Sequence, residues 1–102
     1  MNIREPLPNR RQHEVIEFTH DFHQYTAGIG RYPDGRLAEV FLDSGKTGTG
    51  MQINARDGAI AISLGLQWGA PMDAIREALS RRADGTAEGP LGTLLDLLAE
   101  EG

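Results

Sequence analysis

Gly45–Gly50 is the segment whose residue types best fit the binding of a small ligand. It begins with Gly45-Lys46-Thr47, the order found at the end of a phosphate-binding P-loop, but that motif needs a glycine where this sequence has Val40. The P-loop interpretation therefore fails. A glycine-rich loop before a helix can still bind an anion through free backbone N–H groups, with Lys46 as the cation. The favoured alternative is that the glycines only turn the chain from sheet into helix. The candidate ligand-binding residues are Gly45, Lys46, Thr47, Gly48, Thr49 and Gly50.

A second candidate group contains the polar residues of the segment that follows this loop. Asn54, Arg56 and Asp57 lie in a stretch that is otherwise apolar or small. In a helix, the side chains of Arg56 and Asp57 would diverge by about 100° and could not pair with each other. Glu39 or the N-terminal arm is a candidate partner for Arg56, and a structural salt bridge is the favoured interpretation. The alternative is a docking surface for another chain, formed by Glu39, Asn54, Arg56 and Asp57.

The remaining reactive side chains form no recognisable catalytic or metal-binding pattern. His13, His20 and His23 match no metal signature, and we interpret them as surface or hydrogen-bonded turn residues. Neither Ser44 nor Ser63 stands in a Gly-x-Ser-x-Gly context. The sequence has no cysteine, which excludes disulfides, cysteine–zinc sites and thiol chemistry by these residues. We therefore predict no catalytic residue, no metal site and no cofactor.

Strands are predicted in the first half of the chain. Residues 1–12 are expected to form an extended polar arm, because Pro6 and Pro8 keep the residues before them out of the helical region. Apolar and β-branched residues then recur with the period of a sheet. Pro33-Asp34-Gly35 is a strong turn signal. The predicted strands cover residues 13–19, 22–32 and 37–43.

Helices are predicted in the second half, where the apolar period changes. Thr49 is a candidate N-cap, and Pro71 and Pro90 each suit the first turn of a helix. The predicted helices cover residues 51–68, 71–82 and 90 onwards, with a polar loop over 83–89. In the first helix, Ile53, Ile60 and Leu64 are assigned to the core beside a stripe of alanines and branched residues. In the last helix, the core residues recur at Leu91, Leu94, Leu95 and Leu98.

Together these elements predict one α+β domain over residues 13–102. A three-stranded antiparallel meander is followed by three helices packed on one face, in two layers. The uncovered sheet face and the open strand edges favour a protein partner, and a homodimer is the commonest arrangement of that kind.

The charge and length of the chain limit its partners. It has 102 residues, ten of them basic and fifteen acidic, and a formal net charge of −5. Nucleic-acid binding is disfavoured, because contacts to phosphate come from Lys and Arg. No apolar run is long enough to span a membrane, and the N-terminus has no signal-peptide pattern. A cytoplasmic protein without membrane contact is therefore expected.

Five stretches of the sequence together resemble the TSCPD domain family: Tyr25–Leu42, Asn54–Asp57, Ser63–Gly69, Ile75–Leu79 and Gly89–Gly92. This family forms a C-terminal region of adenosylcobalamin-dependent (class II) ribonucleotide reductases and also occurs as short stand-alone proteins. The cysteine motif that names the family is absent here, and reductase chemistry needs cysteine thiols.

The resemblance therefore implies an accessory or interaction domain rather than an enzyme. Its expected partner is a ribonucleotide reductase subunit or another protein, in a process linked to deoxyribonucleotide synthesis. The alternative is a small-ligand or nucleotide-binding domain that uses Gly45–Gly50.

Overall fold

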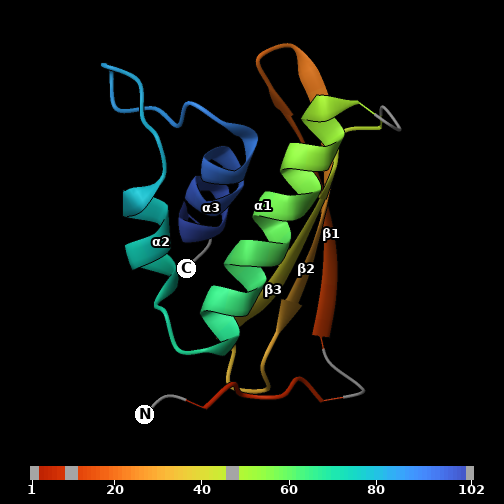
Figure 1. Cartoon of the computed structure of the whole chain (residues 1–102), viewed down its shortest axis with the longest axis vertical. Coiled ribbons are helices and arrows are strands. Elements are labelled where there is room, and N and C mark those ends of the chain that lie inside the picture. Colours follow the sequence, from red (N-terminus) through yellow and green to blue (C-terminus); the bar gives the residue numbers. More distant parts are fainter. Residues whose placement is uncertain (1–2, 9–11, 46–48, 101–102) are drawn as a thin grey trace.

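The computed structural model describes residues 3–8, 12–45 and 49–100 and confirms the α+β class. Three strands form one antiparallel sheet in the order β1-β2-β3, and three helices follow (Figure 1). The described part contains no helix that is both long and apolar enough to cross a membrane. The elements are β1 (Gln12–His20), β2 (His23–Arg31), β3 (Leu37–Asp43), α1 (Gly50–Gln67), α2 (Met72–Ala78) and α3 (Pro90–Glu100).

Two tight turns connect the strands. The predicted turn between β2 and β3 is confirmed: Gly35 has a φ of +94°, and the Asp34 carboxylate accepts the N–H of Arg36 at 3.0 Å. The turn between β1 and β2 consists of Asp21 and Phe22, both of which have a positive φ. A two-residue loop with positive φ at both positions matches the right-handed twist of the two strands that it joins.

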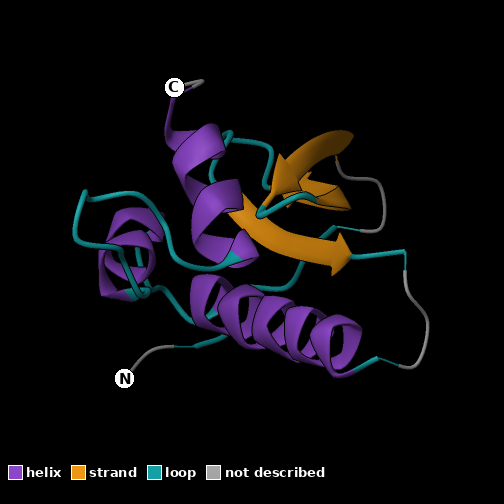
Figure 2. Ribbon diagram, turned by 90° about the horizontal axis from the view of Figure 1, so that it is seen from above, coloured by secondary structure: helices purple, strands orange, loops and turns teal. Residues whose placement is uncertain are grey.

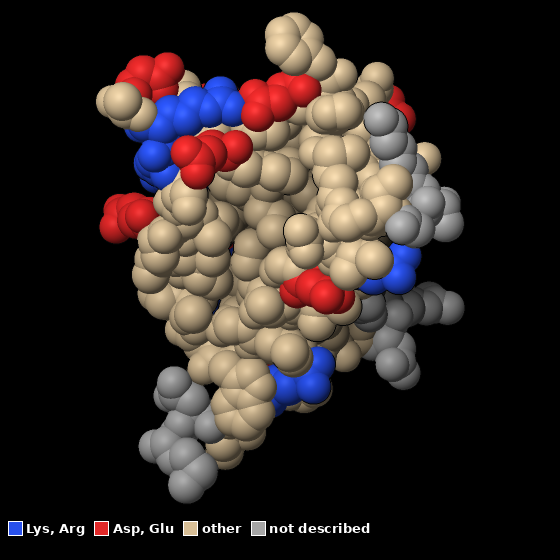
Figure 3. All heavy atoms as spheres, turned by 45° about the horizontal axis from the view of Figure 1, so that its top comes forward, with Lys and Arg blue, Asp and Glu red and all other residues tan. Residues whose placement is uncertain are grey.

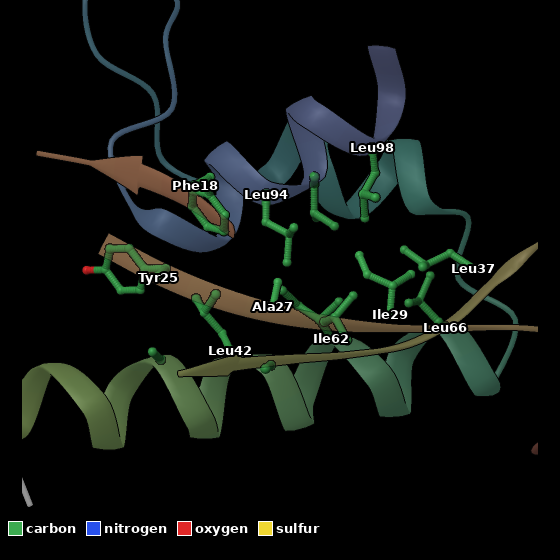
Figure 4. Close-up of a cluster of buried hydrophobic side chains, with 14 residues drawn as sticks. Phe18, Tyr25, Ala27, Ile29, Leu37, Leu42, Ile62, Leu66, Leu94 and Leu98 are labelled. Atoms are coloured by element: carbon green, nitrogen blue, oxygen red, sulfur yellow. The ribbon is translucent and has the colours of Figure 1, made fainter. Parts of the chain in front are cut away.

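The core lies between the inner face of the sheet and the helices. Ile29 of β2 and Val40 of β3 are almost fully buried, and Figure 4 shows side chains of the sheet, α1 and α3 converging there. Seen from above, strands and helices form separate layers (Figure 2). α1 packs mainly against β3, α3 packs against α1 and β1, and α2 packs against α3. The apolar period of the last helix is confirmed, since Leu94, Leu95 and Leu98 are buried.

The polar side chains of α1 seal the outer edge of β3. The Ser63 hydroxyl accepts the N–H of Val40 at 2.9 Å and donates to the Val40 carbonyl at 3.1 Å. The side-chain amide of Gln67 donates to the carbonyl of Ala38 at 3.2 Å. These bonds satisfy backbone groups that another strand would otherwise bind. The expectation of open strand edges is therefore wrong for β3.

The packing of α1 also corrects which of its residues are core. Ile53, Ile60 and Leu64, which the apolar period assigned to the core, are 49%, 49% and 41% exposed. The side that faces β3 instead carries small residues such as Ala55 and Ala59, both buried. A helix that hydrogen-bonds to a strand edge must lie close to it, and only small side chains leave room for that approach. These three residues therefore point outward, whereas other bulky residues of α1 are buried in the core.

α2 is shorter than predicted. It ends at Ala78 rather than near Arg82, because Leu79 takes an extended conformation with φ −72° and ψ 153°. The loop over 83–89, predicted to be polar, contains a buried apolar residue, Ala87. The chain folds back here in a β-bridge between Arg81 and Ala87, and the Ala87 methyl group lies against Gly92 of α3.

Residues 3–8, the described part of the predicted arm, lie against the end of α1. The N–H of Glu5 donates to the carbonyl of Gln67 at 2.7 Å, and Arg4 Nε donates to the Gln67 side-chain oxygen at 2.7 Å. The Tyr32 hydroxyl donates to the carbonyl of Glu5 at 2.8 Å. Gln67 thus joins the N-terminal segment, α1 and the edge of β3.

Candidate interaction surface

The two ends of Gly45–Gly50 are fixed to neighbouring elements. The Asp43 carboxylate accepts the N–H of Gly45 at 2.9 Å and the side-chain amide of Gln52 at 3.3 Å. The Thr49 hydroxyl accepts the N–H of Gln52 at 3.1 Å, which confirms the predicted N-cap of α1. Gly50 is the first residue of that helix. The candidate ligand-binding residues between these ends, Lys46, Thr47 and Gly48, lie outside the described residues.

Glu39, one of the predicted docking residues, is 6% exposed. Its side chain lies over Gly30 of the neighbouring strand, where an added Cβ would be 2.6 Å from the Glu39 Cγ. The missing side chain of Gly30 therefore gives the Glu39 carboxylate its place on the sheet. Within the part of the chain that the structure describes, Glu39 and Arg56 do not pair with each other.

The other three predicted docking residues are exposed on α1, but they border different hollows. Asn54 lines a hollow between α1 and the start of α3, which also contains Met51. Arg56 lines a groove on the other side of the helix. Among the described residues, neither Arg56 nor Asp57 has an ion-pair partner. Arg56 and Asp57 are therefore adjacent in the sequence, but the structure does not place their side chains in a common site.

An open groove of about 510 Å³ lies between α1 and the outer face of the sheet, and we call it the outer groove. Its floor is a row across the three strands in which Val15 pairs with Gly28 and Gly28 pairs with Phe41. Val15 and Phe41 are 66% and 51% exposed, and Gly28 between them has no side chain. Arg56 and Ile60 line the wall that α1 provides.

Beside the outer groove, α1 carries a row of exposed apolar side chains, which we call the α1 ridge. Its members follow the helical period, so they lie on one side of the helix. Exposed apolar surfaces of this kind mark interaction sites in soluble domains. The charged side chains of Figure 3 instead gather over the loop between α2 and α3, where basic and acidic groups alternate. The α1 ridge consists of Ile53, Ile60, Leu64 and Trp68.

The tip of the β1–β2 hairpin is a further exposed apolar feature. Phe22 is fully exposed there. The ring of His20 below it is buried, with Nδ1 2.8 Å from the Thr93 hydroxyl and Nε2 3.0 Å from a carbonyl of the loop before α3. Asp21 is hydrogen-bonded to Arg82, whose guanidinium lowers the pKa of the Asp21 carboxyl. The hairpin tip is therefore held against the helical layer.

The described residues include titratable side chains whose pKa values are shifted by their surroundings. Among them, no cluster of three or more His, Asp and Glu side chains is placed to hold a metal ion. The pKa shifts have structural causes: burial raises the pKa of Tyr25, and the hydrogen bond from Arg81 lowers the pKa of Asp96. The uncovered sheet face and Arg56 could be singled out from the sequence, but the groove itself could not, because its floor comes together only through the register of three strands.

The model of the TSCPD domain matches residues 2–100. The chain is also similar to proteins named "Vitamin B12-dependent ribonucleotide reductase". It is 42% identical to that of Agrobacterium fabrum over 77 residues, which are 76% of this chain and 6% of that protein. It is 38% identical to that of Bradyrhizobium diazoefficiens over 80 residues, 78% of this chain and 6% of that protein. No solved structure matches significantly.

The match thus covers nearly the whole chain, whereas it spans only a small share of the length of these curated relatives. The matched residues include all five stretches that carried the resemblance. The chain therefore belongs to the TSCPD domain family.

Proposed function

We propose that this chain is a non-catalytic accessory domain that binds a B12-dependent ribonucleotide reductase. The observation that carries the proposal is the outer groove with the α1 ridge beside it, an exposed apolar surface on a domain whose relatives carry the matching region within such reductases. In those relatives the matching region is part of a much longer chain. We expect the surface to be covered when the domain binds the reductase.

A binding role also agrees with the residue types of the chain. The sequence has no cysteine, and the reduction of a nucleotide by reductases of this class uses cysteine thiols, as the family resemblance implies. We therefore assign the chain no step of the reaction. Its contribution would be to hold or orient the reductase.

Phe41 is the side chain best placed to contribute binding energy. It lies on the floor of the outer groove and is about half exposed, so a partner that fills the groove would bury it. Large aromatic side chains at the centre of an interface often cost 2 kcal/mol or more (roughly 30-fold in affinity) when they are removed. The Arg56 guanidinium on the groove wall, which has no ion-pair partner among the described residues, would bind an acidic group at the edge of the contact.

The test is capture of the reductase from the host that makes this chain. The tagged domain, its Phe41→Asp variant and its Arg56→Ala variant are each used as bait, and the captured proteins are identified by mass spectrometry. We expect the wild-type domain to retain the reductase, Phe41→Asp to lose it, and Arg56→Ala to retain less of it at an unchanged melting temperature.

Ile3→Asp is the matched control, because Ile3 is an exposed apolar residue outside the outer groove. It should retain the reductase as well as the wild-type domain does. If the wild-type domain retains no reductase, the proposed function is wrong. If Phe41→Asp and Ile3→Asp behave alike, the reductase binds elsewhere on the domain.

Nucleotide binding at Gly45–Gly50 is the second candidate function. The observation that favours it is that Asp43, Gln52 and Arg56, close to the fixed ends of this segment, line one part of the outer groove. Millimolar nucleotide should then raise the melting temperature, and Lys46→Ala should abolish the shift. An unchanged melting temperature with nucleotide would eliminate this candidate.

A further inference from the structure

The tip of the β1–β2 hairpin holds an aromatic residue in a backbone conformation that disfavours it. Phe22 has a φ of +68°, in the left-handed region that bulky residues rarely adopt. Two-residue turns of this type usually end in glycine, and Phe22 occupies the glycine position. Because its side chain is also fully exposed, no burial within the domain compensates for the conformation.

Contacts with the helical layer hold this tip in place. The buried ring of His20 is 2.8 Å from the Thr93 hydroxyl and 3.0 Å from the Glu88 carbonyl. On the other side, Arg82 donates to the Asp21 carboxylate. The residues that flank Phe22 are therefore fixed, so that little further ordering of the backbone is needed when the tip binds another protein.

The charge at the tip is also balanced. Asp21 is the acidic residue next to Phe22, and its pairing with Arg82 leaves no isolated charge beside the ring. A phenyl ring that is exposed, carried on a fixed turn and without a neighbouring free charge is complementary to an apolar pocket. An unfavourable conformation that is kept by its surroundings is typical of functional positions.

We propose that Phe22 is an anchor residue, which inserts its ring into an apolar pocket of the reductase when the domain docks. This inference rests on the proposed function and adds a second contact to the one at the outer groove. It also leads to an unusual prediction. A substitution that relieves the unfavourable backbone conformation should stabilise the domain and weaken its binding to the reductase.

The test compares Phe22→Gly with Phe22→Tyr in the full chain, using the purified reductase of the host as the probe. Phe22→Gly removes the ring and suits the positive φ, so it should raise the melting temperature by roughly 2–6 °C. The same variant should bind the reductase at least about tenfold more weakly, as expected for the loss of an interface anchor. Phe22→Tyr keeps the aromatic ring and should bind within about threefold of the wild-type domain.

Ile3→Gly is the matched control, because it removes an exposed apolar side chain away from the hairpin. It should neither raise the melting temperature nor weaken binding. If the wild-type domain binds the reductase and Phe22→Gly binds equally well, the anchor role is wrong and the proposed function remains. If the wild-type domain does not bind, the proposed function is wrong and the anchor role fails with it. A lower melting temperature of Phe22→Gly would contradict the conformational part of the inference.

Discussion

Removal of the Ser63 hydroxyl should open the sealed edge of β3. In Ser63→Ala, the N–H and the carbonyl of Val40 both lose their hydrogen-bond partner at a buried position. Each buried backbone group without a partner costs about 1–3 kcal/mol. The higher helix propensity of alanine offsets about 0.5 kcal/mol of this loss. We therefore expect the free energy of unfolding to fall by about 1.5–5.5 kcal/mol, a large part of the roughly 5–15 kcal/mol typical of a small domain.

Urea unfolding followed by circular dichroism measures this loss, and hydrogen exchange of the Val40 amide locates it. In Ser63→Ala, the Val40 amide should exchange faster than in the wild-type domain. Ser80→Ala is the matched control, since Ser80 is exposed and its hydroxyl makes no hydrogen bond within the described residues. It should change the free energy of unfolding by less than about 0.5 kcal/mol. A similarly small change in Ser63→Ala, with unchanged exchange at Val40, would refute the edge-sealing role.

Three further predictions test the packing and the ion pairs. Gly30→Ala should lower the free energy of unfolding by about 1–3 kcal/mol in urea, because the added methyl group would overlap the carboxylate side chain above it; an unchanged value would show that this side chain has room to move. Ile62→Ala should cost about 2–4 kcal/mol and Ile60→Ala less than about 1 kcal/mol, because only the first residue is buried; equal losses in urea would contradict this division of α1. The hydrogen bond from Arg81 lowers the pKa of the Asp96 carboxyl, so its stabilising effect is present above the ordinary pKa of 3.8 and is lost as the pH falls through the lowered value. Asp96→Asn should therefore be about 1–2 kcal/mol less stable at pH 7 and approach the wild-type stability once the pH falls below the lowered pKa, whereas a pH-independent difference would argue against the pair.

The strands, the turn between β2 and β3, and α3 could be predicted because their signals are local. Pro33-Asp34-Gly35 fixes a turn by the conformations of its own residues. The leucines of α3 recur on one side of a helix, so their period indicates both the helix and its buried face. Each of these features depends on neighbours within a few positions of the chain.

The buried face of α1 could not be predicted in this way. The helix is apolar on two sides, so its period fits two different orientations. The choice is made by Ser63 and Gln67, which bind the backbone edge of β3, and by the small residues that allow this approach. An orientation that depends on polar contacts to a distant strand leaves no distinct mark in the apolar period.

The candidate site was accessible from the sequence only in part. Arg56 and Asp57 could be recognised as charged residues that need partners on an otherwise apolar helix, and both are exposed. The uncovered sheet face was also expected to bind a partner, but the outer groove could not be located on it, because Val15 and Phe41 meet across Gly28 only through the register of the sheet. The α1 ridge was indicated in the sequence only by the fact that this helix is apolar on two sides.

Sedimentation of the purified domain with the purified B12-dependent ribonucleotide reductase of its host tests the proposed binding most directly. The wild-type domain should sediment with the reductase, and Phe41→Asp should remain at the position of the free domain. The protein concentrations should be well above the dissociation constants of transient protein complexes. If the wild-type domain also stays free under these conditions, the exposed apolar surface does not serve to bind the reductase.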